Sequence, residues 1–318
     1  MDNEREICSV RLDSLISLGK ESPYFPELLN EVITVCESLS IVEKDRILAT
    51  LEQLWLPVAL NLAAISRKLD RTLIQGILGG QGTGKTTLCR VLELILNYLG
   101  ITSTTLSIDD LYLTYTERKT LQQQDPRLVW RGPPGTHDVN LGLQVIEQCL
   151  QGNNTTKILL PRFDKSAFNG VGDRTVPEAI TKPDILLFEG WFVGVQPIAE
   201  NSFNDCPKPI ITAEDRQFAI DSNRRLQAYL PLWSKLDRLI VLSPEDYRLS
   251  KRWRQEAEHK MIAAGKTGMS DREIERFVEY FWKSLHPELF IKPLIETADL
   301  IVKIESDRTI DKVYQSNR

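Results

Sequence analysis

Hydrophobic residues follow a helical spacing in the first part of the chain and an alternation of strand and helix patterns in the rest, with the change near residue 70. In the first part, apolar positions recur at i, i+3, i+4 and i+7, which places them on one face of a helix. One such set is Val32, Val35, Cys36 and Leu39. An earlier apolar group is Leu12, Leu15, Ile16 and Leu18, and a longer apolar stretch runs from Ile47 to Leu69. We expect residues 1–70 to form a helical N-terminal extension that packs on the remainder.

Short apolar runs from residue 73 onward are typical of buried strands. They lie at 73–78, 102–108, 157–161, 184–189, 237–242 and 298–304. Helical patterns fall between them at 85–98, 140–151, 214–230 and 246–264. This alternation predicts an α/β domain over residues 71–318, with a mainly parallel sheet and helices on both faces. Because ligands of such sheets bind beyond the carboxyl ends of the strands, the residues that follow each strand are the candidates for function.

The first strand end carries the most specific motif. Residues 79–86 read Gly-Gly-Gln-Gly-Thr-Gly-Lys-Thr, the pattern G-x-x-x-x-G-K-[ST] of a phosphate loop, between an expected strand and an expected helix. Its glycines let consecutive backbone N–H groups surround a phosphate, and the helix start adds partial positive charge. Lys85 then neutralises phosphate oxygens, and the Thr86 hydroxyl is placed to bind Mg²⁺. The residues expected at the nucleotide are Gly79, Gly80, Gln81, Gly82, Thr83, Gly84, Lys85, Thr86 and Thr87.

Two further strand ends carry carboxylates. Asp109 and Asp110 follow the strand 102–108, and Glu189 ends the apolar run 184–189. A carboxylate that faces the phosphate loop can hold Mg²⁺ or accept the proton of an attacking hydroxyl, and the alternative role is to cap the following turn. We expect one aspartate to be catalytic and the other to be a cap. Glu189 would order the metal shell, and because an acid at the end of so apolar a strand is costly, we expect a cation beside it.

The polar segments 112–138 and 162–183 are too long for simple connectors and are candidate substrate loops. Lys165 and Arg174, in a stretch of mixed charge and glycine, are natural contacts for a carboxylate or a phosphate. Residues Thr136, His137 and Asp138 either bind substrate or cap the helix that begins near residue 140, and the sequence favours neither.

A basic segment after the fifth strand is a candidate lid, near 246–265. Arg248 and Arg252 lie four residues apart, on one face of the expected helix. Such a helix can close and place an arginine on the transferring phosphate, although a solvated basic face is the common explanation of a run of charges.

Composition limits the classes of function. The 318 residues carry a net charge of −5, which argues against a protein that binds nucleic acid over a wide surface. The sequence has no signal-peptide pattern and no apolar run of membrane-spanning length, so we expect no membrane partner. The scattered cysteines, without a C-x-x-C pair, are typical of reduced thiols in a cytoplasmic protein. They are Cys8, Cys36, Cys89, Cys149 and Cys206.

With these motifs assigned, the chain resembles the phosphoribulokinase/uridine kinase/pantothenate kinase group of small-molecule kinases, and within it the D-glycerate 3-kinase branch of plants, yeasts and cyanobacteria. The matching stretches cover most of residues 73–260. They are Gly-Gly-Gln-Gly-Thr-Gly-Lys-Thr-Thr-Leu at 79–88, Ser-Ile-Asp-Asp-Leu-Tyr-Leu-Thr at 107–114, Arg-Gly-Pro-Pro-Gly-Thr-His-Asp at 131–138, Asp-Lys-Ser at 164–166, Gly-Val-Gly-Asp-Arg at 170–174 and Phe-Glu-Gly-Trp-Phe-Val-Gly at 188–194.

The resemblance implies a P-loop kinase fold, ATP with Mg²⁺ as the donor and D-glycerate as the acceptor. It implies Asp109 as the general base and a member of the metal shell, beside Lys85, with Glu189 as the second acid at the metal and Arg252 as the lid arginine. The side chains it suggests at the acceptor are Asp110, Tyr112, His137, Asp138, Arg162, Asp164, Lys165 and Arg174. Another acceptor, such as a nucleoside, pantothenate or a sugar phosphate, remains an alternative. A regulatory ATPase is the alternative from a different class of protein.

Overall fold

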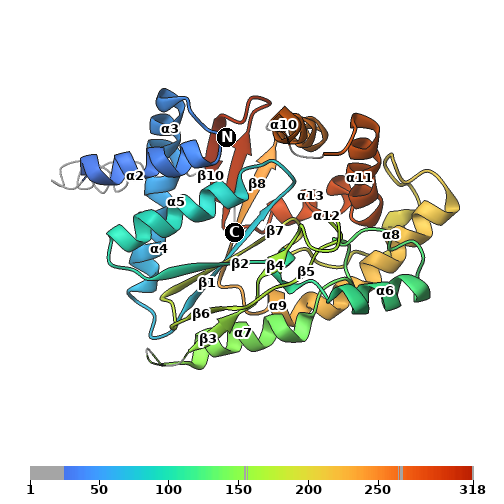
Figure 1. Ribbon diagram of the computed structural model, residues 1–318, viewed down its shortest axis with the longest axis horizontal. Coiled ribbons are helices and arrows are strands. Elements are labelled where there is room, and N and C mark those ends of the chain that lie inside the picture. The colour runs from blue at the N-terminus through green and yellow to red at the C-terminus, as the bar shows by residue number, and fades with distance from the viewer. Residues whose placement is uncertain (1–24, 154, 156, 264, 266–267, 317–318) are drawn as a thin grey trace.

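A six-stranded sheet forms the centre of the molecule in the computed structural model, which describes residues 25–153, 155, 157–263, 265 and 268–316 (Figure 1). The strand order is β10-β9-β8-β1-β7-β2, and every neighbouring pair is parallel except β10 with β9. The strands are β1 (Leu73–Gly79), β2 (Ser103–Ser107), β7 (Ile185–Gly190), β8 (Arg238–Pro244), β9 (Leu300–Ile304) and β10 (Ile310–Tyr314). The α/β class and the mainly parallel sheet expected from the sequence are confirmed.

Strand β7 lies between β1 and β2, which brings the functional strand ends to one edge of the sheet. Glu189 pairs in register with Ile77 of β1 and with Ser107 of β2. Strands β1 and β7 are buried along their whole length, as apolar strands covered on both faces should be. The phosphate loop, the turn after β2 and the end of β7 therefore leave the sheet side by side.

Helices cover both faces of the sheet (Figure 1). Side chains of β1 alternate between two apolar clusters, because successive residues of a strand point to opposite faces. Ile77 packs with α5 (Lys85–Tyr98) and the N-terminal helices, whereas Ile74 packs with α7 (Val139–Gln151) and α9 (Leu230–Trp233). The other helices are α6 (Tyr115–Gln124), α8 (Ala213–Arg225), α10 (Leu249–Ala263), α11 (Asp271–Ser284), α12 (Pro287–Phe290) and α13 (Lys292–Ile295), with 3-10 turns η2 (Ile108–Leu111), η3 (Glu200–Phe203) and η4 (Leu226–Tyr229).

Most of the described N-terminal segment is helical, as its apolar spacing predicted. It contains α2 (Phe25–Ser38), α3 (Lys44–Thr50), a π-helical turn η1 (Leu51–Trp55) and α4 (Leu56–Ser66). The wide turn precedes Pro57, whose ring would clash with the carbonyl four residues earlier in a regular α-helix. The apolar group Leu12 to Leu18 lies outside the described residues. The division into 1–70 and 71–318 stays a prediction.

The continuous helix Lys44–Ser66 corrects one expectation, because the sequence does contain an apolar run of membrane-spanning length. By length and composition alone this helix could cross a membrane. However, 56% of its most apolar window is buried inside the molecule. Leu51 and Leu62 share an apolar cluster with α5 and the sheet, so core packing explains the apolar side chains.

The expected strand 157–161 is not part of the central sheet, and this part of the prediction is wrong. Strand β3 (Ile158–Leu160) pairs antiparallel with β6 (Glu178–Ile180), and β4 (Phe163–Asp164) pairs antiparallel with β5 (Asp173–Arg174). Leu159 is 57% exposed between two buried neighbours. One solvated face is typical of an antiparallel pair, whereas a central parallel strand is covered on both sides.

The two expected substrate loops are therefore more regular than the sequence indicated. The segment 162–183 contains these short antiparallel strands, and the segment 112–138 contains α6. Helix α6 has no buried residue, which explains why its sequence lacks an apolar periodicity. Its start is defined instead by a capping box in which Thr114 and Glu117 satisfy each other's backbone N–H groups.

The four described cysteines are free thiols, as expected. Cys36, Cys89 and Cys149 are buried, and Cys206 is half-buried. Burial raises the pKa of Cys36 and of Cys149 to about 11, so both thiols are protonated at neutral pH.

Candidate active site

The phosphate loop connects β1 to α5 as the motif requires. Gly82 and Gly84 have φ angles of 78° and 90°, a region that residues with a Cβ rarely adopt. Gly82 also has no room for a side chain, since a Cβ there would lie 2.6 Å from the Cβ of Trp253. Helix α5 begins at Lys85 directly after the left-handed Gly84, so its first N–H groups face the loop.

Side chains of the loop are held by its own backbone. The Lys85 ammonium group donates to the Gly80 carbonyl at 3.1 Å, and the Thr83 hydroxyl donates to the same oxygen at 2.9 Å. Thr86 is exposed and Thr87 is half-buried at the start of α5. Oε1 of Gln81 is buried without a hydrogen-bond partner in the described part of the chain. Lys85 donates only one hydrogen bond among the described residues, so its ammonium group still has N–H donors for a phosphate group. The exposed Thr86 hydroxyl is free to bind a cation.

Asp109 and Asp110 lie in turn η2, directly after β2, and they have different partners. Asp110 accepts the Ser107 N–H at 3.1 Å in a capping box, and the same oxygen accepts from Arg162 at 3.0 Å. Burial raises the pKa of Asp110, although both of these contacts oppose the shift. Of the two roles expected for the pair, Asp110 has the structural one.

The Asp109 carboxylate faces polar groups of the candidate substrate segments. Its Oδ1 accepts the Tyr112 hydroxyl at 2.8 Å, and its Oδ2 accepts the Lys165 ammonium group at 2.6 Å. Burial alone would raise the pKa of Asp109, but the charge and hydrogen bond of Lys165, with the hydrogen bond of Tyr112, hold it below its usual value. Asp109 is therefore ionised at neutral pH, as a general base must be.

Glu189 is a buried acid at the end of β7. Its side chain has no hydrogen bond or ion pair among the described residues, although Glu189 is only 8% exposed. Such a carboxylate fits a cation, together with the exposed Thr86 hydroxyl and Asp109. The described residues contain no cluster of three or more metal-binding side chains, so a Mg²⁺ ion here would need phosphate oxygens and water to complete its shell.

The segment 131–138 is packed against the η2 turn. His137 stacks on Tyr112 with ring centroids 4.5 Å apart, and its Nδ1 is 2.8 Å from the Tyr229 hydroxyl. Burial lowers the pKa of His137 to about 3, so the ring is neutral. Its Nε2 is buried and has no partner in the described part of the chain. Asp138 caps α7 by accepting the Leu141 N–H at 3.0 Å. Asp138 thus has the capping role that the sequence left open.

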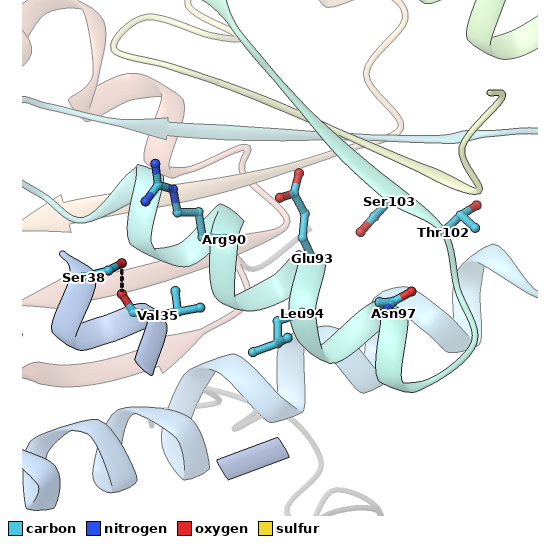
Figure 2. Close-up of a pocket in the computed structure, with 8 residues that line it drawn as sticks. All are labelled: Val35, Ser38, Arg90, Glu93, Leu94, Asn97, Thr102 and Ser103. Atoms are coloured by element: carbon cyan, nitrogen blue, oxygen red, sulfur yellow. Dashed lines mark hydrogen bonds between the residues drawn. The ribbon is translucent and has the colours of Figure 1, made fainter. Parts of the chain in front are cut away.

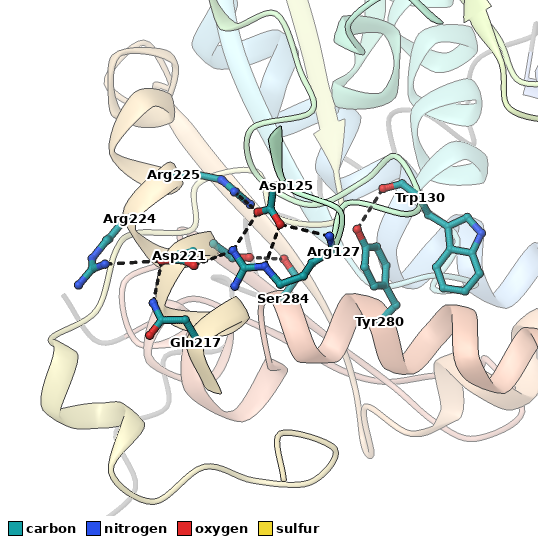
Figure 3. Close-up of polar contacts among 10 residues, drawn as sticks. Asp125, Arg127, Trp130, Gln217, Asp221, Arg224, Arg225, Tyr280 and Ser284 are labelled. Carbon is teal, nitrogen blue, oxygen red and sulfur yellow. Dashed lines mark hydrogen bonds and ion pairs between the residues drawn. The ribbon is translucent and has the colours of Figure 1, made fainter. Parts of the chain in front are cut away.

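A polar cluster holds residues 125–130, which directly precede this segment, against α8 and α11 (Figure 3). Asp125 accepts from Arg127 and from Arg225, and Arg127 also donates to Asp221 at 2.7 Å. The Tyr280 hydroxyl donates to the Trp130 carbonyl at 3.2 Å. We call Asp125, Arg127, Asp221 and Arg225 the α6–α8 clamp. The clamp was not expected from the sequence, because Asp125 and Arg127 are about 100 residues away from their partners Asp221 and Arg225.

The basic residues of the segment 162–174 also have protein partners. Arg162 donates to Glu178 at 2.7 Å and to the Thr105 carbonyl at 3.0 Å. Arg174 donates to Asp138 and to the Tyr112 carbonyl, both at 2.9 Å. Asp164 is exposed. Its Oδ1 accepts the N–H and the hydroxyl of Ser166, and these two hydrogen bonds stabilise the turn after β4. The two arginines and Asp164 thus maintain the shape of the segment.

Arg252 is an expected site residue whose contacts in the structure are with protein groups outside the phosphate loop. It donates to the Ser306 carbonyl, and its Nε lies 3.3 Å from Glu256. Helix α10 still touches the phosphate loop through Trp253, which packs beside Gly82. Lys251 fixes α10 to α11 by ion pairs with Glu275 and Glu279. A lid role for Arg252 would therefore require its release from Ser306.

Sequence reasoning missed two arginines beside Tyr112. Arg131 donates to the Gly170 and Val171 carbonyls, and Arg118 donates to the Val171 and Gly172 carbonyls. Neither has a carboxylate partner among the described residues. Both guanidinium groups lie over the Phe163 ring, at 5.3 and 5.4 Å from its centroid. The signals in the sequence were their position in the polar segment 112–138 and, for Arg131, its place at the start of the matching stretch 131–138.

Two cavities lie near these elements. One, of about 490 Å³, borders Gly79–Gln81 and is lined by aromatic residues of α11 and its neighbours, including Trp191, Phe281 and Trp282. The other, of about 520 Å³, lies between α2, α5 and the start of β2, with Arg90, Glu93 and Ser103 in its wall (Figure 2). None of the predicted site residues lines the second cavity, whereas Gly79, Gly80 and Gln81 of the phosphate loop line the first.

Known proteins resemble the chain over most of the described residues. It is 33% identical to the chloroplastic D-glycerate 3-kinase of Arabidopsis thaliana over 248 residues, which cover 74% of this chain and 52% of that protein. It is 33% identical over 224 residues to an uncharacterized kinase, mug58, of Schizosaccharomyces pombe, which covers 66% of this chain and 79% of the relative. The chain belongs to the D-glycerate 3-kinase-like family of P-loop kinases. It spans about half the length of the plant relative.

A solved structure agrees with this family. The D-glycerate 3-kinase of Cryptococcus neoformans superposes with a TM-score of 0.72 at 28% identity, over 81% of this chain and 96% of that one. No family model matches the chain. The P-loop kinase fold expected from the motifs is therefore confirmed, while the roles of the individual site residues stay predictions.

Proposed function

We propose that this chain is an ATP-dependent kinase that transfers a phosphoryl group to the primary hydroxyl of D-glycerate, giving ADP and 3-phosphoglycerate. The observation that carries the proposal is the common edge of β1, β7 and β2, where the phosphate loop, Glu189 and Asp109 lie side by side. A donor nucleotide and an acid that can accept a hydroxyl proton are needed at one point for phosphoryl transfer. D-glycerate is proposed because two similar proteins are named D-glycerate 3-kinases.

The donor half of the site consists of the phosphate loop and two acids. Loop amides at the start of α5 and the Lys85 ammonium group would hold the β- and γ-phosphates. Thr86, Asp109 and Glu189 would hold Mg²⁺, and Glu189 suits that task because its side chain has no partner among the described residues. Bound Mg²⁺ would neutralise charge on the phosphate oxygens.

The acceptor half consists of the segments 131–138 and 162–174 around Asp109. Asp109 would orient the acceptor hydroxyl and accept its proton as the phosphoryl group is transferred. The pKa of Asp109 lies below its usual value, so the base is present in its active form at neutral pH. Tyr112 fixes the carboxylate through Oδ1, which leaves Oδ2 as the oxygen that a substrate can approach once Lys165 moves.

An acceptor panel tests this function. The purified protein is incubated with Mg-ATP and with D-glycerate, pantothenate, uridine or a sugar phosphate, and ADP release is measured while the phosphorylated product is identified by mass. We expect D-glycerate to accelerate ADP release strongly and to yield 3-phosphoglycerate. Transfer to uridine or pantothenate without transfer to D-glycerate would contradict the acceptor, and equal ADP release without any acceptor would favour the regulatory ATPase. The cytoplasmic location stays a prediction of the sequence.

A further inference from the structure

The basic residues around Asp109 differ in how firmly they are bound to the protein. Arg162 has two carboxylate partners, Asp110 and Glu178. Arg174 has Asp138 and the Tyr112 carbonyl. Either arginine would have to give up at least two contacts with the protein, one of them an ion pair with a carboxylate, to reach a substrate. These two arginines are therefore positioning residues of the acceptor segments.

Lys165 is bound differently. Its only partner among the described residues is Asp109 Oδ2, at 2.6 Å, and its side chain is 61% exposed. The long lysine stem can rotate without any change in the backbone. The backbone itself is held, because Arg131 and Arg118 bind the carbonyls of residues 170–172 across the loop. Lys165 is thus an exposed cation with one carboxylate partner, in a segment whose backbone is held at residues 170–172.

The Lys165 contact covers the oxygen that the reaction needs. Tyr112 already donates to Oδ1, so Oδ2 is the remaining oxygen for the acceptor hydroxyl. An acceptor without charge would have to break the ion pair and leave the ammonium group without a counter-ion. An acceptor with its own carboxylate offers the ammonium group a new ion pair in exchange for the one with Asp109.

We propose that Lys165 is the specificity-determining residue of the acceptor site, and that it makes the site require an anionic acceptor. In the free enzyme Lys165 covers Asp109. The carboxylate of the acceptor then takes Lys165 from Asp109, and the freed Oδ2 receives the acceptor hydroxyl. This inference rests on the proposed kinase function, and it selects Lys165 over Arg174 as the contact of the acceptor carboxylate.

The test compares charged and uncharged acceptors in the wild type and in Lys165→Gln. Initial rates of ADP release with saturating Mg-ATP are measured for D-glycerate, its methyl ester, glycerol and pantothenate, and without acceptor. In the wild type we expect a carboxylate-bearing acceptor to exceed the ester and glycerol by about 10- to 100-fold in kcat/KM, the range of one hydrogen bond to a charged group. Lys165→Gln should remove most of this preference, raise the rate with glycerol, and raise the acceptor-free rate of ATP hydrolysis.

Two further variants serve as controls. Lys165→Arg keeps the positive charge and should restore part of the preference for carboxylates. Lys157→Gln removes an exposed lysine just before β3, outside the site, and should behave as the wild type.

The outcomes separate this inference from the proposed function. If pantothenate is the better acceptor and Lys165→Gln removes the preference for it, the D-glycerate proposal is wrong and the role of Lys165 holds. If Lys165→Gln lowers the rates of D-glycerate and glycerol equally, Lys165 acts on the transferring phosphate and the inference is wrong. A wild type that phosphorylates uncharged acceptors best, or none at all, overturns both.

Discussion

Asp109 and Asp110 are neighbours in the sequence, but their contacts predict different results on substitution. We expect Asp109→Asn to lower kcat by about 10²- to 10⁴-fold, because the general base is lost. Asp110→Ala removes the cap of η2 and should lower the free energy of unfolding by about 1 kcal/mol with a much smaller effect on kcat. Steady-state kinetics and urea unfolding of both variants measure the two effects. A loss of kcat in Asp110→Ala as large as in Asp109→Asn would contradict the separation of roles.

His137 should make the stability of the protein depend on pH. Burial lowers its pKa to about 3 in the folded state, whereas the unfolded value is about 6.5, so protonation favours unfolding. The stabilisation is complete above the unfolded pKa and is lost as the pH falls from there toward the folded value. Between pH 7 and pH 5 this one group should cost about 2 kcal/mol.

The comparison with His137→Gln isolates this contribution, because the other titrating groups are common to both proteins. Urea unfolding at pH 7, 6 and 5 should show a smaller loss of stability in the variant than in the wild type. The same loss in both proteins would mean that His137 is not buried in the neutral form.

At the scale of elements, the α6–α8 clamp fixes the segment that carries the predicted acceptor residues. Asp125 is 12% exposed and lies between two arginines, whose hydrogen bonds, with burial opposing them, hold its pKa well below the usual range. Asp125→Ala leaves Arg127 and Arg225 without this partner, and we expect a loss of about 2 kcal/mol in the free energy of unfolding. The KM for the acceptor should rise while the KM for ATP stays unchanged.

A matched control for this prediction exists on the same helix. Glu214 of α8 is exposed and has no hydrogen bond or ion pair among the described residues. Glu214→Gln should therefore change the free energy of unfolding by less than about 0.5 kcal/mol and leave the kinetics unchanged. An Asp125→Ala variant with normal stability, or with an equal rise in the KM for ATP, would contradict the role of the clamp in positioning the 131–138 segment.

Sequence patterns predicted the elements that depend on local information. Strand β1 and helix α5 match their predicted ranges because an apolar run, a glycine motif and an apolar helix face follow one another in the chain. The pairing of β3 with β6 depends on residues 20 positions away, and an apolar triplet does not show on which side it meets solvent. The resemblance implied Arg252 as the lid arginine, whereas its hydrogen-bond partner in the structure is Ser306, 54 residues away. The features that were not predicted thus depend on contacts between residues far apart in the chain, which local sequence patterns do not show.

At the scale of the whole molecule, the N-terminal helices and the nucleotide-binding sheet share one hydrophobic core. Leu51 of η1, Leu92 of α5 and Ile77 of β1 are fully buried in the same cluster. A core that is shared in this way couples the stability of the N-terminal segment to that of the catalytic edge, because no helix in the cluster can leave without exposing the sheet.

This shared core predicts that the described chain unfolds in one step. Leu51→Ala should cost about 2–5 kcal/mol, the usual range for removing a buried leucine, and should shift the whole urea transition. Leu159→Ala is the control, since Leu159 is 57% exposed and its truncation should have little effect. Within each protein, circular dichroism and tryptophan fluorescence should report the same midpoint of unfolding, although that midpoint is lower in Leu51→Ala than in the wild type. Two separate transitions, with Leu51→Ala shifting only the first, would show that the N-terminal helices form an independent unit, and the phosphate loop would then keep its nucleotide affinity after they unfold.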